Sequence, residues 1–536
     1  MISKNKTILL LIILLAFFLR FFMLGKNPPS LYSDEASLGY NAYSILKTGY
    51  DEFGQKLPLD KFIAFGDYKP IGYIYAAVPS IALFGLNEFA IRFPSALSGV
   101  LMVIMTYYLV KELFNKEKLA LISAFLLAVS PWSLHLSRAA FEANLAALLN
   151  LLAVYFFVKG AKEKGYYLIF SMICFAGTFY TFNSNRVLMP LLLLALFLVY
   201  FKDLWKKKQW FVGSIIIIFI LLLPLAPYLR SRESRLRFHE VNIFSNLNVV
   251  VQANQRIAAD GGTRLAKLAH HRFFGHASNF LKHYFDHFSG EFLFISGDIN
   301  PRLSVRSVGE LYLIELPFFL IGLYLLLTNL KKKSYLLILL WFLLAPVPAA
   351  AARETPHALR IVSILPTPQI ISALGLLFVF NYFRKYRFFS LFLVTYSLFF
   401  ALSFLYYLHS YYFVFPKLYA DQWLDGYKQA VNYVSENQNK YDKIYITNHY
   451  SRPYIYLLLY LNYPPVKYNK LVDRERDWYG NWSVKSFDKY IFGDDIEETD
   501  KRILYLGKPE ISIAKLSKID EIKDSNQKTV FWVFEK

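Results

Sequence analysis

Cysteine and charged side chains are scarce in this sequence of 536 residues. Cys174 is the single cysteine, so an intrachain disulfide is impossible. Only 18% of the residues are charged and 56% are hydrophobic, whereas about a quarter of a soluble protein is charged. The glycine-rich phosphate-binding motifs, the G-x-S-x-G motif and the C-x-x-C motif are absent too. These absences argue against a disordered chain, an ordinary soluble enzyme and a user of intracellular nucleotides.

A net charge of +20 remains to be explained. The basic residues stand between long apolar runs, where the orientation of a membrane protein requires them. We therefore expect the lipid bilayer as a partner and no nucleic acid.

Eleven apolar runs are long enough to approach the roughly 20 residues that a membrane-crossing helix needs. They are 7–24, 94–113, 119–136, 140–158, 166–182, 187–202, 210–228, 310–330, 335–351, 359–380 and 388–408. Clusters of lysine and arginine recur in alternate connections, which predicts a cytoplasmic N-terminus and an external C-terminus. If a further apolar run, 70–86, also crossed the membrane, it would invert this pattern of charges. It is therefore predicted to be a juxtamembrane or re-entrant helix. The first run reads as an uncleaved anchor.

The predicted topology leaves three external regions, residues 25–93, 229–309 and 409–536. In the last region, an amphipathic stretch at 421–436 predicts a helix, and 443–447, 502–506 and 530–534 predict strands. We expect an α-helical polytopic membrane domain over 1–408 and a small external α/β domain over 409–536. The protein is expected in the plasma membrane.

Adjacent carboxylates follow the first predicted span. Asp34 and Glu35 could provide a base and a group that orients a ligand or holds a metal, or they could simply cap a helix. Lys69, preceded by Asp67 and Tyr68, could bind a phosphate as a point charge. Its alternative role is that of an interfacial lysine that extends its ammonium to water.

Cations also recur in short external turns, against the usual charge bias. Arg138, Arg186, His357 and Arg360 occupy three such turns. Ionisable groups at membrane depth are candidates for function, and an anionic ligand near the outer interface would explain them together. Arg138 has an alternative, an ion pair with Glu142 four residues later.

The second external region holds six of the ten histidines. His283 and His287 are spaced to share one face of a helix, which suits a metal ion. No acidic ligand stands at the position that a zinc protease would use. Hydrogen bonding is therefore the alternative for both rings.

Several motifs in order resemble the GT-C membrane glycosyltransferases, specifically the protein O-mannosyltransferase and aminoarabinose-transferase-like family. The resemblance covers about residues 7–408. Its motifs are Asp34-Glu35-Ala36, Gly39-Tyr40-Asn41-Ala42-Tyr43, Tyr68-Lys69-Pro70, Arg92-Phe93-Pro94-Ser95, Ser137-Arg138, Tyr284-Phe285-Asp286-His287, Phe292-Leu293-Phe294, Gly297-Asp298 and Pro356-His357-Ala358-Leu359-Arg360.

This resemblance implies transfer of a sugar from a polyprenyl phosphate to an acceptor on a protein, lipid or glycan at the outer membrane face. The catalytic aspartate of the family maps onto Asp34. Lys69 corresponds to a contact with the donor phosphate, and Arg138 and Arg360 match positions that face the lipid phosphate or shape its cavity. We expect inversion at the anomeric carbon and convergence of these four residues on one cavity.

A divalent metal is left open by the resemblance. Some relatives place a metal-binding glutamate immediately before the lysine, whereas Tyr68 stands there in this chain and Asp67 comes one residue earlier. The candidate ligands are Asp67, His283 and His287.

Two other functions compete with transfer. A transporter or flippase of lipid-linked sugars would more often show inverted repeats, and none is visible. A polymerase or ligase of lipid-linked glycans could also use external arginines. A binding module that is merely anchored in the membrane would need one span, not eleven.

Overall fold

The computed structural model describes residues 4–231, 234, 242–476, 482–496, 501–510 and 516–536. The chain forms two compact units. Unit 1 comprises Met1–Leu19, Ser98–Ser137 and Glu142–Leu408, and unit 2 comprises Arg20–Leu97, Arg138–Phe141 and His409–Lys536. Each unit is considered by itself below.

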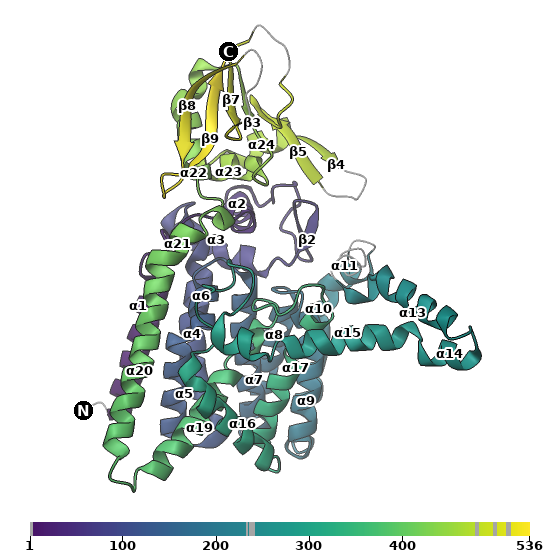
Figure 1. The fold of residues 1–536 in the computed structure, drawn as a ribbon, viewed down its shortest axis with the longest axis vertical. Coiled ribbons are helices and arrows are strands. Elements are labelled where there is room, and N and C mark those ends of the chain that lie inside the picture. The colour runs from purple at the N-terminus through teal and green to yellow at the C-terminus, as the bar shows by residue number, and fades with distance from the viewer. Residues whose placement is uncertain (1–3, 232–233, 235–241, 477–481, 497–500, 511–515) are drawn as a thin grey trace. The chain divides into compact units, whose positions relative to one another are not determined.

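Unit 1 is built mainly from apolar helices that run alongside one another (Figure 1). Two of them reach into unit 2 at one end, α1 (Lys4–Phe21) and α4 (Glu88–Phe114). The others are α5 (Glu117–Val129), α6 (Pro131–Ser137), α7 (Glu142–Lys162), α8 (Tyr167–Phe179), α9 (Asn185–Trp205), α10 (Lys208–Leu222), α16 (Leu316–Thr328), α17 (Lys333–Leu344), α18 (Val347–Ala350), α19 (Thr367–Phe383) and α20 (Phe389–His409).

Seven helices in the described part of the chain are long and apolar enough to cross a membrane, or eight if the bent pair α5–α6 is one span. The predicted class, a helical polytopic membrane protein, is confirmed. Each of the eleven predicted runs contains a helix, but three do not meet the length and composition of a span. Helices α8 and α16 have 13 residues each, about 20 Å against a hydrocarbon core of about 30 Å. Helix α1 carries Lys4, Lys6 and Arg20 in its 18 residues.

Glycine allows a close helix contact in unit 1. A Cβ atom on Gly322 of α16 would lie 1.9 Å from the carbonyl oxygen of Ile371 in α19, and one on Gly375 would lie 1.9 Å from that of Phe318. Small residues at helix contacts let backbones approach in this way. The two glycines therefore fix how α16 packs against α19.

The second predicted external region forms a helical arm of unit 1. It contains α11 (Ala226–Arg230), η2 (Ile243–Ser245), α13 (Leu247–Ala259), α14 (Arg264–Ala269), α15 (Arg272–Asp286) and η3 (Glu291–Ile295). Helices α13 and α15 run sideways from the bundle in Figure 1. We call residues 247–286 the hairpin.

Unit 2 combines the first predicted external region with the C-terminal tail. The first region contains α2 (Ser33–Thr48), the antiparallel strands β1 (Phe62–Ala64) and β2 (Asp67–Lys69), and α3 (Gly72–Phe84). Helix α3 falls within the run 70–86, which was predicted to be helical but not a crossing, and its 13 residues are short for a span.

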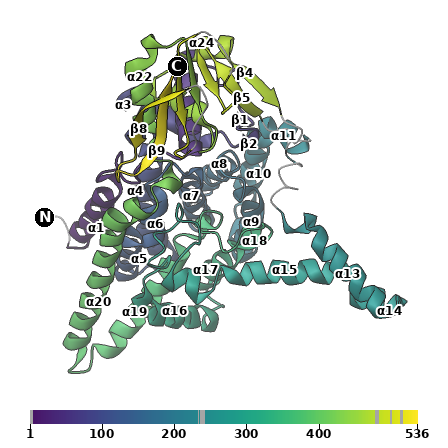
Figure 2. The same cartoon turned by 45° about the horizontal axis from the view of Figure 1, so that its top comes forward.

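The tail forms a seven-stranded mixed sheet, coloured yellow and light green in Figure 2. The strand order is β4-β5-β6-β3-β7-β9-β8. The elements are η6 (Ser410–Val414), α21 (Phe415–Leu418), η7 (Asp421–Trp423), α22 (Tyr427–Asn437), η8 (Gln438–Lys440), β3 (Lys443–Ile446), α23 (Pro453–Tyr460), α24 (Pro465–Leu471), β4 (Asp473–Arg476), β5 (Trp482–Phe487), β6 (Tyr490–Phe492), β7 (Ile503–Gly507), β8 (Ser517–Lys523) and β9 (Thr529–Glu535). The predicted helix and all three predicted strands are present, so the α/β character of the tail is confirmed.

Buried tyrosines join the tail to α2 within unit 2. The Tyr40 hydroxyl donates to the carbonyl oxygen of Tyr463 at 2.9 Å, and the Tyr456 hydroxyl donates to that of Leu31 at 3.0 Å. The two compact units therefore differ from the two predicted domains. The prediction divided the chain at residue 409 and assigned the first external region to the membrane domain. That division stays a prediction.

Candidate functional site

Helix α2 begins at the acidic pair. Tyr32 is extended, and Ser33, Asp34 and Glu35 form the first turn, where carboxylates favour the positive end of the helix. Glu35 Oε2 also accepts a hydrogen bond from the Tyr32 amide at 3.4 Å. Glu35 therefore caps helix α2, which is the alternative role that the sequence offered for the acidic pair.

Glu35 is fully buried against Arg92 of α4. Arg92 Nε donates to Glu35 Oε1 at 3.0 Å and Nη2 donates to Oε2 at 3.1 Å, with neither side chain exposed. The Ala140 amide donates to the same carboxylate at 2.7 Å. Because all these donors already surround the carboxylate, the geometry gives Glu35 a structural role.

Asp34 points to a different partner. The strands β1 and β2 form a tight turn in which Phe65 has φ +57° and Gly66 has φ +89°, and this turn brings Lys69 to the start of α2. Lys69 Nζ lies 2.5 Å from Asp34 Oδ1. The lysine side chain is 13% exposed and the aspartate is 39% exposed, so the ion pair opens to its surroundings on the side of the carboxylate.

Residues of the tail border this pair. Ser33 and Ser451 place their hydroxyl oxygens 3.0 Å apart. The guanidinium of Arg452 lies 5.0 Å from the ring centre of Phe65 in the β1–β2 turn, and its Nη1 donates to the carbonyl oxygen of Trp482. The sequence did not point to Ser451 or Arg452, because no motif or spacing links residue 451 to residue 33.

Asp67 and Tyr68 share strand β2 with Lys69. Tyr68 is partly buried, and the ammonium of Lys61 lies 4.9 Å from the centre of its ring. Asp67 pairs in register with Ala64. Asp67 and Tyr68 therefore directly precede Lys69 on strand β2.

Arg138 is buried in unit 2 and its donors are used by the protein. Its Nη2 donates to the carbonyl oxygens of Phe22 at 2.7 Å and Asn27 at 3.0 Å, and its Nε donates to the Tyr411 hydroxyl. Its guanidinium also lies 5.3 Å from the ring of Tyr412. These contacts hold the chain after α1 in place, and they give Arg138 a structural role.

A second group of predicted residues lies in unit 1. Asp298 accepts hydrogen bonds from the amides of Asn300 at 2.8 Å and Ala358 at 2.6 Å. Glu310 Oε1 accepts from the Asp298 amide at 3.1 Å. Burial raises the pKa of Asp298 to about 6 and that of Glu310 well above its usual value. The two acids fasten the loop after η3 to the segment that carries His357 and Arg360.

His287 and His357 are neutral imidazoles near the charge of Arg360. Burial, with help from Arg360, lowers the pKa of His357 to about 3 and that of His287 to about 4. His287 Nε2 is buried with no hydrogen-bond partner within the described residues. Arg360 is 24% exposed, donates a hydrogen bond to the Glu354 carbonyl oxygen at 3.1 Å and forms an ion pair with the Glu354 carboxylate at 3.6 Å. The predicted residues Asp298, His287, His357 and Arg360 are thus gathered within one unit.

These depressed pKa values predict acid sensitivity of unit 1. A histidine whose pKa is lower in the folded state stabilises the fold above its unfolded pKa of 6.5, and this contribution is lost as the pH falls toward 4. We expect His357→Gln to remove about 2 kcal/mol of the destabilisation that occurs between about pH 7 and pH 5. Thermal unfolding of the detergent-solubilised protein over this range checks it. Parallel curves for the variant and the wild type would contradict the assignment.

Two further predicted residues lie in unit 1. Arg186 Nε donates to the carbonyl oxygen of Phe179 at 3.0 Å, and the guanidinium lies 5.3 Å from the ring of Tyr228. Glu142 is the first residue of α7 and is partly buried.

No group of three or more histidine, cysteine or acidic side chains that could hold a metal ion occurs among the described residues. The candidate ligand His283 uses Nδ1 on the carbonyl oxygen of Ala352 at 2.9 Å, and His287 uses Nδ1 on that of His283 at 2.8 Å. Each ring therefore uses Nδ1 on a backbone carbonyl oxygen. No cofactor is established.

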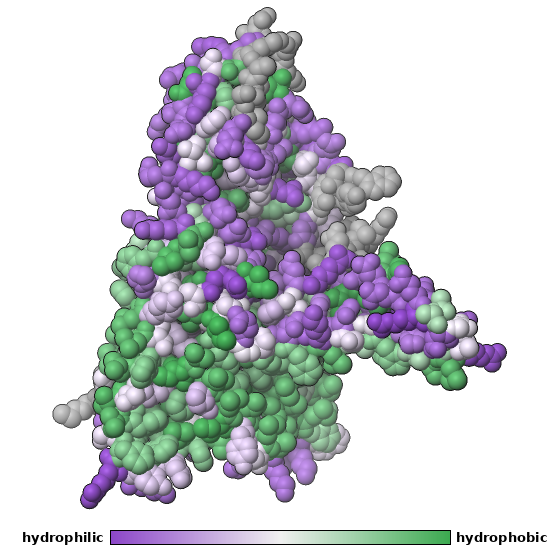
Figure 3. Space-filling view, viewed as in Figure 1, coloured by the Kyte–Doolittle hydropathy of each residue, from purple (hydrophilic) through white to green (hydrophobic). Residues whose placement is uncertain are grey.

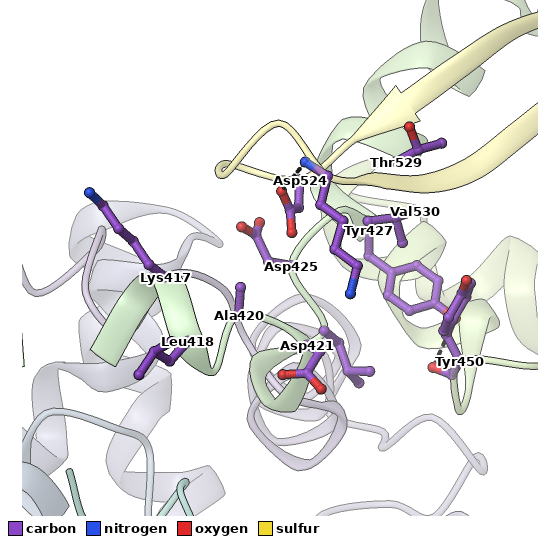
Figure 4. A pocket seen from close by; sticks show the side chains of 12 residues that line it. Lys417, Leu418, Ala420, Asp421, Asp425, Tyr427, Tyr450, Asp524, Thr529 and Val530 are labelled. Atoms are coloured by element: carbon purple, nitrogen blue, oxygen red, sulfur yellow. Dashed lines mark hydrogen bonds between the residues drawn. The ribbon is translucent and has the colours of Figure 1, made fainter. Parts of the chain in front are cut away.

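A cavity of about 220 Å³ lies in the tail and is lined by aspartate, lysine and tyrosine side chains (Figure 4). Asp425 accepts a hydrogen bond from the Ser525 amide at 3.0 Å, and Asp524 accepts from the amides of Asn526 and Lys528. These carboxylates hold the β8–β9 turn, so we assign no chemistry to this cavity.

The architecture defines the class of protein. The chain has the fold of the GT-C membrane glycosyltransferases, which confirms the predicted fold class and the resemblance seen in the sequence. Residues 68–228 match the family of dolichyl-phosphate-mannose-protein mannosyltransferases. No curated protein sequence matches the chain significantly.

Several solved structures share this fold, and two of them match over most of this chain. ArnT from Cupriavidus metallidurans in the apo state has 11% identity and a TM-score of 0.58, over 99% of this chain and 98% of that one. Archaeoglobus fulgidus AglB, an oligosaccharyltransferase in complex with an inhibitory peptide and a dolichol-phosphate, has 14% identity and a TM-score of 0.51. That match covers 85% of this chain and 63% of AglB, so the chain spans less than two thirds of AglB. At these identities the likeness shows the fold alone.

Proposed function

We propose that the protein transfers a sugar from a polyprenyl phosphate to an acceptor hydroxyl on a protein, lipid or glycan. The ion pair between Asp34 and Lys69 carries this proposal, because it sets a half-exposed carboxylate beside a fixed cation. The donor class is supported by ArnT, which has been solved bound to undecaprenyl phosphate. AglB supports it as well through its dolichol-phosphate.

The reaction needs a base and a stabilised leaving group. Asp34 accepts the proton of the acceptor hydroxyl while the hydroxyl oxygen forms a bond to the anomeric carbon. The bond from that carbon to the phosphate oxygen breaks, and its electron pair leaves with the polyprenyl phosphate. Lys69 offsets the charge that develops on the phosphate. A single displacement of this kind inverts the anomeric centre.

The site is proposed to face the outside of the plasma membrane. Lysines border the connection between α4 and α5 and the start of α17, namely Lys111, Lys116, Lys118 and Lys331–Lys333. Such clusters favour the cytoplasmic side. The α/β tail would then be external, and the N-terminus cytoplasmic.

Arg360 is proposed as a second residue that contacts the lipid phosphate, because its sequence motif resembles that of the family. Arg138 and Glu35 are proposed as residues that shape the fold around the site, because their polar atoms are buried in protein contacts. No step of this reaction is assigned to a metal ion. His283 and His287 each use Nδ1 on a backbone carbonyl oxygen, which leaves Nε2 of each ring for a ligand.

A transporter or a polymerase of lipid-linked glycans remains the rival. A transporter binds its substrate without breaking a bond. Incubation with polyprenyl-phosphate sugars therefore distinguishes a transferase from a transporter. Purified protein is mixed with a panel of such donors and with hydroxyl acceptors, and free polyprenyl phosphate is measured. Donor-dependent release supports transfer, and binding without release of polyprenyl phosphate would overturn it.

Lys69→Met is expected to raise the KM for the donor by about 10- to 100-fold, because a charge-assisted contact contributes about 1.5–3 kcal/mol. Lys69→Arg is expected to lose less, since it keeps the charge. Lys61→Met is the matched control, as the Lys61 ammonium lies over the ring of Tyr68. Donor titration at saturating acceptor measures the effect. Equal KM values for Lys69→Met and Lys61→Met would refute the phosphate contact.

A further inference from the structure

The hairpin of unit 1 presents an apolar face that is largely exposed in the described part of the chain. Helix α15 has no buried residue. Its apolar side chains recur on one side, and Phe273 is 65% exposed and Phe285 62% exposed. Leu265 and Leu268 of α14 are also exposed. Apolar surface of this extent signals a contact with another phase or molecule.

Contacts with the membrane bundle fix the direction of this face. The Tyr284 hydroxyl donates to the carbonyl oxygen of Leu343 at 2.8 Å, near the end of α17. His283 Nδ1 lies 2.9 Å from the carbonyl oxygen of Ala352, just after α18. The base of α15 is thus attached at the end of a candidate membrane span, opposite the end that carries Lys331–Lys333.

The apolar face continues the apolar surface of the bundle. Figure 3 shows hydrophobic residues over the bundle helices and along the side of the hairpin that faces the same way. Hydrophilic residues follow the other side of the hairpin. Since the bundle surface contacts lipid tails, the same phase extends to the hairpin.

A groove on the hairpin has the chemistry of a lipid contact. It has a volume of about 630 Å³ and lies between η2 and α15, where Phe244, Phe273, Phe280 and Leu281 line it. Arg272 also borders it. An acyl chain suits the apolar walls, and an arginine suits a phosphate.

The charges of the hairpin point the same way. Within residues 247–286 the sequence has the cations Arg256, Arg264, Lys267, Arg272 and Lys282, and the acids Asp260 and Asp286. Asp260 is paired with His270 and Asp286 accepts a hydrogen bond from Thr355. An amphipathic helix with aromatic residues on one face and cations on the other lies in the membrane interface.

We propose that the hairpin is an interfacial membrane anchor. Its apolar face is immersed among the acyl chains of the outer leaflet, the groove is filled by a phospholipid tail, and the cations contact headgroup phosphates. A protein partner would need a matching apolar surface that ends where the bilayer begins, whereas a lipid surface fits the continuity with the bundle directly.

Site-directed spin labelling of the full-length protein tests the proposal. In a Cys174→Ser background, which has no other thiol, Leu281→Cys labels the apolar face and the exposed Ser278→Cys labels the side of α15 that borders α13. The proteins are reconstituted in vesicles of phosphatidylcholine and phosphatidylglycerol. Collisions with oxygen report lipid, and collisions with a water-soluble nickel chelate report solvent. Phe273→Cys is a second apolar position in case Leu281→Cys fails to reconstitute.

The label at Leu281 is expected to show an oxygen-to-nickel collision ratio at least several-fold above that at Ser278. Equal ratios at the two positions would place the hairpin in water and overturn the proposal. Low collision rates with both reagents at Leu281 would also overturn it, because they would indicate a protein partner on this face. The readout does not depend on catalytic activity.

Discussion

Asp34→Asn is expected to lower the rate of sugar transfer by about 100- to 10,000-fold, the usual contribution of a positioned base. Asparagine keeps the size of the side chain but cannot accept the proton of the acceptor hydroxyl. Because the wild-type carboxylate is 39% exposed and paired with Lys69, the loss should appear in kcat. Release of polyprenyl phosphate under saturating donor and acceptor measures it.

Asp60→Asn is the matched control. Asp60 belongs to the same external region and its Oδ1 accepts a hydrogen bond from the adjacent Lys61 amide, so its loss tests a carboxylate without a catalytic assignment. Thermal unfolding should be nearly the same for both variants, which separates chemistry from folding. Full activity of Asp34→Asn would refute the assignment of the base, and another carboxylate would then have to be sought.

The membrane helices could be predicted from the sequence because each one is a long apolar run between cationic connections. This pattern predicts helix length poorly at α8 and α16, because each of these 13-residue helices lies within a longer apolar run. Aromatic and aliphatic residues continue past the helix ends into turns. Hydropathy indicates which residues prefer an apolar environment. It does not indicate the residue at which the helical hydrogen bonds end.

The candidate site was predictable in part, and the reason differs from residue to residue. Asp34 and Lys69 stand in motifs, and the structure brings them together although they are 35 positions apart. Glu35 looks equivalent to Asp34 in the sequence, but successive residues of a helix point in different directions, so one is half-exposed and the other is buried against Arg92. Ser451 could not be found, since its neighbourhood depends on how the tail packs on α2.

Arg138 shows a further limit of reasoning from charge. A cation in a short outer turn indicated a ligand, yet its donors are used by the carbonyl oxygens of Phe22 and Asn27. Backbone carbonyls that leave helix α1 need donors when they are buried. A buried arginine can supply several at once, and nothing in the sequence distinguishes this use from phosphate binding.

Arg92→Met is expected to be the most destabilising substitution in unit 2, by about 3–5 kcal/mol, because it leaves the buried carboxylate of Glu35 without its counter-charge. Arg92 also donates to the carbonyl oxygens of Leu24 at 3.1 Å and Pro28 at 2.9 Å, and to that of Ser30. These carbonyls lose their donors in the variant. Yield after detergent extraction and the thermal unfolding midpoint are the measurements. Lys485→Met is the control, since both members of its ion pair with Glu475 are exposed and the pair contributes at most about 1 kcal/mol.

A double variant decides whether the loss belongs to the Glu35–Arg92 pair or to the other acceptors of Arg92. If the unpaired carboxylate is the main cost, Arg92→Met combined with Glu35→Gln should be more stable than Arg92→Met alone, with a coupling energy of about 1–3 kcal/mol. Glutamine retains an acceptor for the Ala140 amide, which donates to Glu35 at 2.7 Å. If the double variant is as unstable as the sum of the single ones, the carbonyls of residues 24–30 account for the effect. In that case Arg92 acts mainly by holding the segment that leads into Asp34, and Glu35 only positions the guanidinium.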